Sequence, residues 1–278
     1  MKKLIALLLA ALMLVSTTVL FTSCSGDEEI IVQTNAFFAP FEYYDGTEIK
    51  GVDVEIMAKV GEKLDKKVVF KNVEFSAIID NVAEGKVCDA GAAGITITDE
   101  RKEKVDFSIP YYTSVQYVIY AADSDIETKN GKYIVWEALK GMTIGTQTDT
   151  TGWIYADGEI NGEEGVLYKT DTELKNFDNA QLAADGIKSN LVDVVIIDEL
   201  PAEYITSKNK NLKCLPLYYS GADGEEDAPV EEEYAICVTK GNDELLKAIN
   251  EVLKDMMVKD ANGETQIDKL LMKHMGLA

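Results

Sequence analysis

The feature that most constrains the fold of this chain is an alternation between strand-like and helix-like segments. The first run of this alternation consists of residues 29–35 (strand), 53–64 (helix), 66–73 (strand), 76–85 (helix) and 87–93 (strand). Short apolar runs rich in β-branched residues predict the strands, and apolar residues at helical spacing predict the helices. Strands that alternate with helices in this way form parallel sheets with helices on both faces. The sequence therefore predicts an α/β fold.

The alternation restarts after residue 140, which indicates a second lobe. The second run consists of residues 141–147 (strand), a helix from Thr150, residues 165–170 (strand), a helix from Thr172, and residues 191–198 (strand). Two helical patterns, 243–258 and 265–276, close the chain. About 250 residues suit two hydrophobic cores and lie at the upper limit for one. We therefore predict two α/β lobes with parallel-type sheets.

The first 23 residues have the pattern of a secretory signal peptide. Two lysines precede an apolar run that ends near Val15, and small and hydroxyl residues then lead to Cys24. A permanent membrane helix is the alternative, but a span requires about 20 apolar residues and this run is shorter. The ending LFTSC resembles the lipobox of bacterial lipoproteins, in which the cysteine is lipidated. We predict a signal peptide at 1–23, lipidation of Cys24 and a polar tether at 24–29.

The charge of the chain excludes several classes of partner. The net charge is −22, and removal of residues 1–23 makes it −24. A chain this acidic lacks the basic surface that binds phosphate backbones, which argues against nucleic acid. Anionic lipid headgroups would repel it, so a lipid on Cys24 is the expected route to a membrane. The predicted location is therefore outside the cytoplasm, at the membrane surface.

Cysteine and histidine offer little material for metal or catalytic chemistry. Cys88, Cys214 and Cys237 show no CxxC spacing, and we expect them to be small buried hydrophobic residues. His274 is the only histidine. The acidic stretch 221–233 lacks the ligand spacing of a calcium loop and is expected to be a solvated loop. We predict no metal and no cofactor.

Arg101 is the only arginine in the 278 residues. It follows a strand-like segment and a capping residue, Thr98, which places it where open α/β sheets bind ligands. A guanidinium holds a carboxylate by two parallel hydrogen bonds, which a lysine cannot copy. The alternative, a surface ion pair with Asp99 or Glu103, explains a cation but not the choice of arginine. The sequence therefore predicts a carboxylate clamp at Arg101.

Four blocks of the sequence resemble those of the family 3 bacterial extracellular solute-binding proteins, the polar amino-acid receptors of ABC importers. The blocks are NAFFAPFEYYDGTEIKGVDVEI, FSAIIDNVAEGKVCDAGAAGITITDERKEKVDFSIPYY, IGTQTDTTGW and LVDVVIIDELPA. They occur in the family's order, and the resemblance covers residues 30–276. It implies two lobes joined by two hinge strands, with an amino acid enclosed between the lobes. By this resemblance lobe 1 comprises residues 30–111 and 234–278, and lobe 2 comprises residues 115–230.

The resemblance also implies three groups of ligand-binding residues. They are Arg101, Thr96, Thr150 and Thr151 for the α-carboxylate, Gly94 and Asp198 for the α-ammonium, and Asn35, Phe38, Phe75, Gln147 and Ile197 around the side chain. The helix that begins near Thr150 would offer backbone N–H groups to the carboxylate. Asp198 also follows a run of apolar strand residues, which places it at the carboxyl edge of a sheet. The alternatives are an N-cap role for Asp198 and core positions for Phe38 and Phe75.

Other aspartates in the matching blocks receive different interpretations. Asp149 stands where the family usually has glycine. We expect it to cap the following helix and to place its charge close to the ligand carboxylate. Asp53 and Asp193 also match family positions, and we interpret both as structural.

The function predicted from the sequence is a monomeric, lipid-anchored receptor that captures an amino acid and delivers it to an ABC permease. The ligand is expected to be neutral, because the residues assigned to its side chain are amides and apolar groups. One alternative is a cyclohexadienyl-dehydratase-like enzyme on the same fold. An enzyme requires a general acid or base near the reacting carbon, and none of the side-chain positions titrates, so we predict no catalysis. An amino-acid sensor module is the other alternative.

Overall fold

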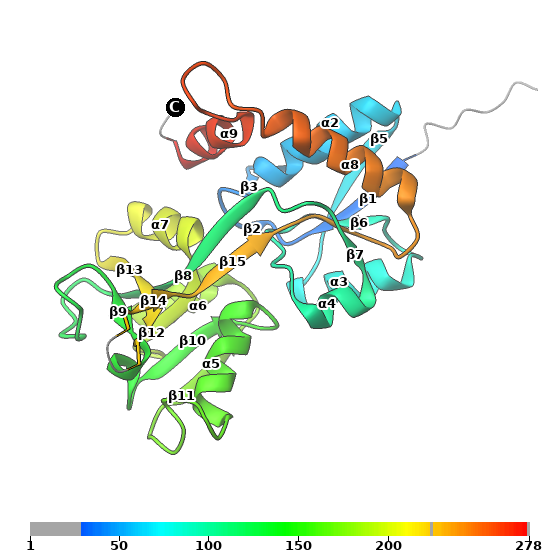
Figure 1. Cartoon of the computed structure of the whole chain (residues 1–278). Helices are drawn as coiled ribbons and strands as arrows, with labels where there is room; N and C mark the ends of the chain where they lie inside the picture. Colours follow the sequence, from blue (N-terminus) through cyan, green and yellow to red (C-terminus); the bar gives the residue numbers. More distant parts are fainter. Residues whose placement is uncertain (1–28, 223–224, 277–278) are drawn as a thin grey trace, which may run out of the picture.

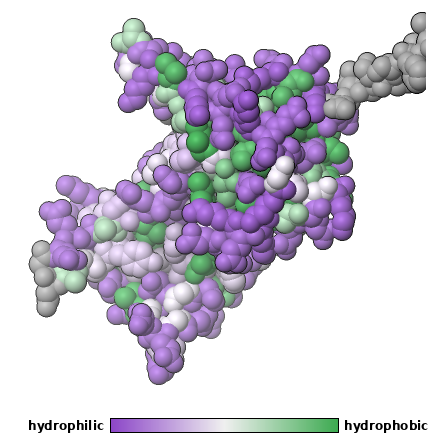
Figure 2. All heavy atoms as spheres, turned by 45° about the vertical axis from the view of Figure 1, so that its right-hand side comes forward, coloured by the Kyte–Doolittle hydropathy of each residue, from purple (hydrophilic) through white to green (hydrophobic). Residues whose placement is uncertain are grey.

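Two α/β lobes joined by a pair of strands make up the structure, a computed structural model that describes residues 29–222 and 225–276 (Figure 1). The predicted signal peptide, Cys24 and the tether as far as Glu28 lie outside the described residues. Within the described part of the chain, no helix is long and apolar enough to cross a membrane. Polar side chains cover most of the face shown in Figure 2, as the net charge of −22 leads one to expect.

Lobe 1 is built on a sheet of five strands in the order β5-β1-β6-β16-β7. Its strands are β1 (Glu29–Thr34), β5 (Lys67–Asn72), β6 (Ala90–Gly91), β7 (Asp106–Phe107) and β16 (Cys237–Val238). Its helices are α2 (Val52–Leu64), α3 (Phe75–Glu84), α4 (Asp99–Lys104), α8 (Asp243–Met256) and α9 (Gln266–Met275). A small sheet of β2 (Phe37–Phe38), β3 (Glu42–Asp45) and β4 (Glu48–Lys50) extends from the end of β1.

Lobe 2 is built on a larger sheet with the order β11-β10-β12-β8-β13-β14. Its strands are β8 (Tyr112–Ala121), β10 (Thr143–Gln147), β11 (Glu173–Phe177), β12 (Val194–Asp198), β13 (Leu212–Tyr219) and β14 (Ala228–Pro229), with β9 (Ile134–Val135) beside β13. The helices are α5 (Thr151–Asn161), α6 (Ala180–Lys188) and α7 (Glu199–Lys208), and a 3₁₀ turn, η1, spans Trp136–Leu139.

Both sheets are mixed, so the prediction of parallel-type sheets is only half right. In lobe 1, β5, β1 and β6 are parallel, whereas β16 is antiparallel to β6 and β7. In lobe 2, β11, β10 and β12 are parallel, whereas β8 runs antiparallel to β12 and β13. The antiparallel members follow from the connectivity. β8 and β16, which are the first strands to enter each sheet after the chain crosses between the lobes, run in the opposite direction to the βαβ strands of that sheet.

Two antiparallel strands carry the chain between the lobes. The first half of β8 pairs with β15 (Glu231–Tyr234), with Tyr112 opposite Tyr234 and Val115 opposite Glu231. β8 then continues into the centre of the lobe 2 sheet. Figure 1 shows both strands side by side in the waist of the molecule. Because the chain crosses here twice, the lobes are tied at one edge and are free to close over the other.

Most of the predicted elements form where the hydrophobic pattern is strong. β12 is buried over its whole length, and α8 buries one face through Leu245, Ala248, Ile249, Val252, Leu253 and Met256. The predictions of a strand at 165–170 and a helix from Thr172 are wrong, because that segment is β11 followed by α6. β11 is an edge strand whose five residues are exposed or half-buried, so it carries only a weak hydrophobic signal. The more apolar segment GVLYKT forms turns instead.

Candidate ligand-binding site between the lobes

One pocket between the lobes contains ten of the eleven residues that the sequence assigned to ligand binding. Its lining is Asn35, Phe38, Glu42, Phe75, Ala93, Gly94, Thr96, Arg101, Gln147, Thr150, Thr151 and Asp198. Lobe 1 contributes the residues up to Arg101 and lobe 2 contributes the others. The eleventh expected position, Ile197, lines an adjoining pocket together with Phe38 and Gln147. The structure thus brings these residues together, and their roles toward a ligand stay predictions.

Arg101 joins the two lobes through its guanidinium group. Thr98 caps α4 by accepting a hydrogen bond from the backbone N–H of Arg101 at 3.1 Å, as its position in the sequence predicts. The side chain of Arg101 is only 7% exposed. Its Nη1 donates to the carbonyl of Thr96 at 2.8 Å, and its Nη2 donates to the carbonyl of Asp149 in lobe 2 at 2.9 Å. Because a guanidinium carries five N–H donors, several remain for a bound carboxylate.

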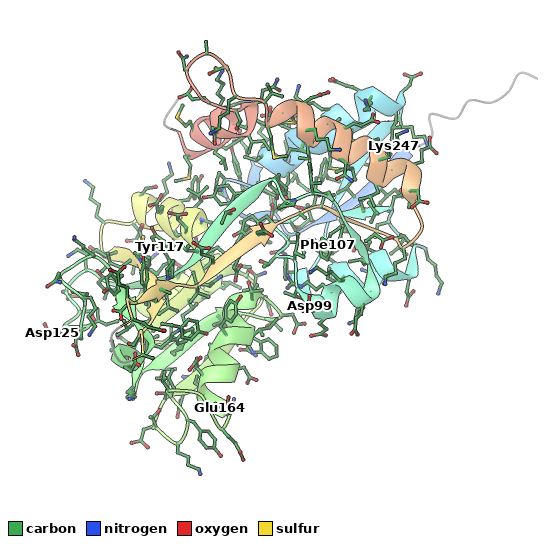
Figure 3. The ribbon with its side chains drawn as sticks, viewed as in Figure 1. Asp99, Phe107, Tyr117, Asp125, Glu164 and Lys247 are labelled. Atoms are coloured by element: carbon green, nitrogen blue, oxygen red, sulfur yellow. The ribbon has the colours of Figure 1, made fainter. Side chains whose placement is uncertain are left out.

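The alternative of a surface ion pair does not describe Arg101. Among the described residues, Asp99 pairs with Lys102 at 3.2 Å and not with Arg101. The guanidinium carbon lies 5.4 Å from the centre of the Phe75 ring, so the cation rests over an aromatic wall of the pocket. Asp99, at the start of α4, lies on the side of lobe 1 that faces lobe 2, whereas Lys247 lies on its far side (Figure 3). Arg101 is therefore a buried cation directed into the interlobe pocket.

The turn at Asp149 has a different capping residue from the one predicted. Thr150, not Asp149, caps α5, because its side chain accepts from the backbone N–H of Trp153 at 3.3 Å. Asp149 has a positive φ of 61°, the left-handed region that favours glycine, which agrees with the glycine that the resemblance led us to expect there. Asp149 is exposed and lines an outer pocket with Lys104, and this outer pocket shares Arg101 and Phe75 with the interlobe pocket. Asp149 does not line the interlobe pocket itself, and the expectation that its charge lies close to the ligand carboxylate stays a prediction.

Asp198 belongs to a buried network of polar side chains at the hinge. It occupies the N-cap position of α7 but makes no capping hydrogen bond with its side chain. Instead the Tyr234 hydroxyl donates to Asp198 Oδ2 at 2.5 Å, and the Gln116 amide donates to Asp198 Oδ1. The same Gln116 nitrogen donates to Glu232 at 3.0 Å, and Thr96 donates to Glu232 at 2.7 Å. The network places two carboxylates next to the pocket.

These two carboxylates make the pocket favourable for a cation. Burial raises the pKa of Asp198 well above its usual value, and the neighbouring charge of Glu232 raises it further. Burial likewise raises the pKa of Glu232, although hydrogen bonds from Thr151, Thr96 and Gln116 oppose the shift. Both pKa values are raised because a buried carboxylate loses its hydration and meets too few positive charges and hydrogen-bond donors to offset that loss. An ammonium group bound beside Asp198 would offset that cost.

The other end of the pocket is formed by amides and aromatic rings. Gln147 of lobe 2 donates to the side-chain carbonyl of Asn35 in lobe 1 at 3.0 Å, and Asn35 donates to the carbonyl of Val73 at 2.7 Å. Phe38 is 8% exposed and Phe75 is half-buried, so each ring packs in the protein and also lines the pocket. The core and pocket-wall interpretations of these rings are thus compatible.

Three residues near the pocket were not singled out from the sequence. Glu232 falls in the stretch 221–233 that we predicted to be a solvated loop, and this prediction is wrong for its end, where Glu232 is 4% exposed in β15. Gln116 and Glu42 are completely buried. The strand pairing of β15 with β8, and of β2 with β3, was the missing information, because it directs Glu232 and Glu42 inward. A polar residue between aromatic ones, as in FEYY, was the only local signal for Glu42.

The structure also gives the positions of the two aspartates that we interpreted as structural and of the three cysteines. Asp53 is buried and accepts from the backbone N–H of Gly94 at 2.9 Å, and Asp193 accepts from the backbone N–H of Thr143 at 2.7 Å. Cys88, Cys214 and Cys237 are free thiols. Within residues 29–222 and 225–276, no cluster of histidine, cysteine and acidic residues is arranged to hold a metal ion.

Comparison with known proteins decides the family. The model of the bacterial extracellular solute-binding proteins, family 3, matches residues 30–276. The chain belongs to this family. The arginine-binding extracellular protein ArtP of Bacillus subtilis (strain 168) is 30% identical over 272 residues, which are 96% of each chain.

Solved structures of this solute-binding family share the fold. An ancestral arginine-binding protein bound to glutamine is 32% identical, with a TM-score of 0.70 over 89% of this chain and 98% of that one. An ancestral arginine-binding protein bound to arginine is 30% identical, with a TM-score of 0.71 over 88% and 97% of the two chains. The predicted family and the two-lobed fold are therefore confirmed. The relatives are amino-acid-binding proteins of ABC importers, and they include proteins named for arginine, histidine, cystine and glutamine.

Proposed function

We propose that this solute-binding protein captures a free α-amino acid with an uncharged side chain and delivers it to the permease of an ABC importer. The observation that carries the proposal is a single interlobe pocket lined by the buried cation of Arg101 and the buried carboxyl group of Asp198, with the buried Glu232 hydrogen-bonded to Thr96 beside it. Arg101 and the N-terminus of α5 would bind the α-carboxylate. Asp198 and the carbonyl of Gly94 would bind the α-ammonium. The ligand would then hold both lobes together, because its two charged groups have partners on each.

The proposal of a neutral side chain rests on the pocket residues that are not assigned to the α-carboxylate or the α-ammonium of the ligand. Asn35 and Gln147 are uncharged amides, and Phe38 and Phe75 are apolar. A charged side chain enclosed among them would lose hydration without an opposite charge, at a cost of several kcal/mol. Asp149, the residue that could have paired with a basic ligand, has its side chain in the outer pocket. The relatives named for arginine make a basic ligand the main competing outcome.

The location and the division of the chain are parts of the same proposal. The protein would be exported by the signal peptide at 1–23 and held at the membrane surface by a lipid on Cys24, through the tether 24–29. Lobe 1 would comprise 30–111 with 234–278, and lobe 2 would comprise 115–230. The pairing of β8 with β15 between the two sheets supports hinges near 111–115 and 231–234. We expect the receptor to act as a monomer and to use no cofactor.

Catalysis remains a less favoured function, although one reason against it needs correction. The sequence suggested that no titratable group lies at the side-chain end of the pocket, yet Glu42 lines it. Glu42 is fully buried and lies beside the buried Asp53, so two negative charges at this place would repel each other. We therefore propose binding without chemistry. A bound amino acid recovered unchanged in mass after long incubation with the protein would support this, and a product lacking water or carbon dioxide would contradict it.

A thermal-shift screen against the twenty amino acids tests the proposed function. A ligand at 100 times its Kd adds about 2.7 kcal/mol to the free energy of unfolding, which gives a clear rise in Tm. We expect the largest rise with a neutral amino acid, confirmed by calorimetry as a one-to-one complex. The largest rise with lysine or arginine would refute the neutral ligand but not the receptor. No rise with any of the twenty would refute amino-acid binding itself.

A further inference from the structure

Glu42 is a buried acid for which the described residues supply no hydrogen-bond donor. It is 0% exposed, and neither of its carboxyl oxygens accepts a hydrogen bond from an N–H or O–H group. Glu42 opens β3, opposite Phe38 in β2, and this pairing directs it toward α2 and the interlobe pocket. A fully buried carboxylate with no donor would be an uncompensated charge in the interior, which folded proteins avoid.

The group within hydrogen-bonding reach of Glu42 is another acid, Asp53. Asp53 already has donors on both oxygens. The Tyr111 hydroxyl donates to Oδ1 at 2.5 Å, and the Gly94 N–H donates to Oδ2 at 2.9 Å. Two ionised carboxylates in contact would repel each other, whereas one proton between them makes a strong hydrogen bond. Because Asp53 is the acceptor for two donors, the proton belongs on Glu42.

The charges around the pair favour the same arrangement. Burial is the first cause that raises the pKa of Glu42 well above its usual value, and the charges of Asp53 and Asp198 add to it. Burial raises the pKa of Asp53 to about 6, but the hydrogen bonds from Tyr111, Gly94 and Glu42 all lower it. The groups that face Glu42 are thus Asp53 on α2, Asp198 at the end of β12, and Tyr111 before β8. Arg101 on α4 lines the same pocket.

We propose that Glu42 is protonated in the folded protein, donates that proton to Asp53, and thereby positions Gly94 for the ligand ammonium. Gly94 has a φ of 54°, and its N–H is fixed by Asp53. This fixes the peptide group that precedes Gly94, and the backbone angles of Gly94 then set the direction of its carbonyl, which would face the ammonium site. Glu42 is then a positioning residue, because it acts through Asp53 and not on the ligand. The last step rests on the proposed function, whereas the protonation of Glu42 does not.

The proposal also bears on the class of ligand. A protonated Glu42 adds a neutral group to the pocket, which agrees with a ligand whose side chain is uncharged. An ionised Glu42 would instead supply the negative charge that a lysine or arginine side chain needs. The protonation state of one buried residue therefore separates the two ligand classes.

The first test measures stability without ligand in wild type and in Glu42→Gln, which keeps a neutral donor of similar shape. An acid whose folded-state pKa is raised holds its proton after the unfolded chain has lost it. Stability is therefore lost as pH rises from the unfolded pKa, near 4.5, through the folded one. One such proton makes the unfolding constant rise by up to tenfold per pH unit. We expect urea titrations from pH 5 to 8 to show this component in wild type and not in Glu42→Gln.

Controls make this test specific. Glu48→Gln changes a glutamate in the same small sheet whose side chain is 75% exposed, and we expect it to keep the pH dependence of wild type. If Glu42→Gln does not fold, carbon-13 spectra of wild type and of Glu232→Gln, both labelled at the glutamate carboxyl carbon, give the answer, because Glu232→Gln removes the other buried glutamate whose pKa is raised. At least one glutamate must then remain protonated at pH 7. An identical pH dependence in wild type and Glu42→Gln, or spectra in which every glutamate is ionised at pH 7, would overturn the proposal.

The second test measures ligand affinity with the amino acid found by the thermal-shift screen. We expect Glu42→Gln to bind within about threefold of wild type, and Glu42→Met, which lacks a donor, to bind at least tenfold more weakly. Rescue by glutamine but not by methionine identifies the donor role. A tenfold loss in Glu42→Gln would overturn the proposal and indicate an ionised Glu42 that contacts the ligand. If wild type binds none of the twenty amino acids, the proposed function fails while the stability test still decides the protonation of Glu42.

Discussion

Replacement of Arg101 by lysine tests whether Arg101 clamps the ligand carboxylate and how much the clamp contributes to ligand affinity. The guanidinium reaches two carbonyl oxygens in different lobes, Thr96 at 2.8 Å and Asp149 at 2.9 Å, and retains N–H groups for a ligand. A lysine ammonium has a single nitrogen, so it cannot hold both carbonyls and also present two parallel donors to a carboxylate. Loss of one charge-assisted hydrogen bond costs about 1.5–3 kcal/mol. The expected effect of Arg101→Lys is a Kd roughly ten- to over a hundredfold higher.

Isothermal titration calorimetry with the tightest-binding amino acid measures this effect directly. The matched control is Lys102→Ala, one residue further along α4, which removes an exposed cation that pairs with Asp99. We expect its Kd to equal that of wild type. A Kd within threefold of wild type for Arg101→Lys would refute the clamp. If the variant also lost thermal stability, Arg101 would then be a structural link between the lobes and not a ligand-binding residue.

Three further predictions concern the anchor, the ligand and the helix that faces it. Cys24→Ser should move the protein from the washed membrane fraction to the soluble fraction, and retention on the membrane would contradict lipidation. In a calorimetric competition series, neutral amino acids should bind more tightly than glutamate, lysine or arginine. Asp149→Gly should leave that order unchanged, because the side chain of Asp149 lies outside the pocket; a preference for lysine or arginine that Asp149→Gly abolishes would make Asp149 the specificity residue. Thr150→Ala removes the N-cap of α5 and should lower the free energy of unfolding by about 0.5–2 kcal/mol in urea titrations, whereas Thr47→Ala, which changes an exposed threonine in a turn, should change it little.

The sequence predicts the elements of this fold well where burial is one-sided or complete. β12 is apolar at four of its five positions, and α8 has apolar residues at helical spacing, so both were expected in place. β11 was missed, because an edge strand with exposed side chains has no such pattern. The resemblance implied the two hinge strands, but the antiparallel direction of β8 and β16 within their sheets was missed. Their direction depends on how the chain returns between lobes, which no local pattern encodes.

In the candidate site too, residues with a local sequence signal were predicted, and residues whose position depends on distant strand pairing were not. Arg101 could be singled out because it is unique in composition and follows a capping threonine. Gln116 and Glu42 could not be assigned to the site from local pattern, because a single polar residue in an apolar segment gives no sign of the partner it will meet. Glu232 was hidden in an acidic run that reads as solvated. What directs it inward is the register of β15 against β8, residues more than 100 positions away in the chain.

The uniqueness of Arg101 has a practical consequence for measuring the motion of the lobes. A dicarbonyl reagent that reacts with guanidinium groups has one target in the 278 residues, so the mass of the intact protein reports modification at one known place. In the structure that target is 7% exposed and held by carbonyls of both lobes, so we expect the reagent to modify it faster when the lobes separate. The labelling rate then measures how often the lobes open. The fraction that resists labelling at a given ligand concentration counts the occupied receptors, with no fluorophore or engineered residue.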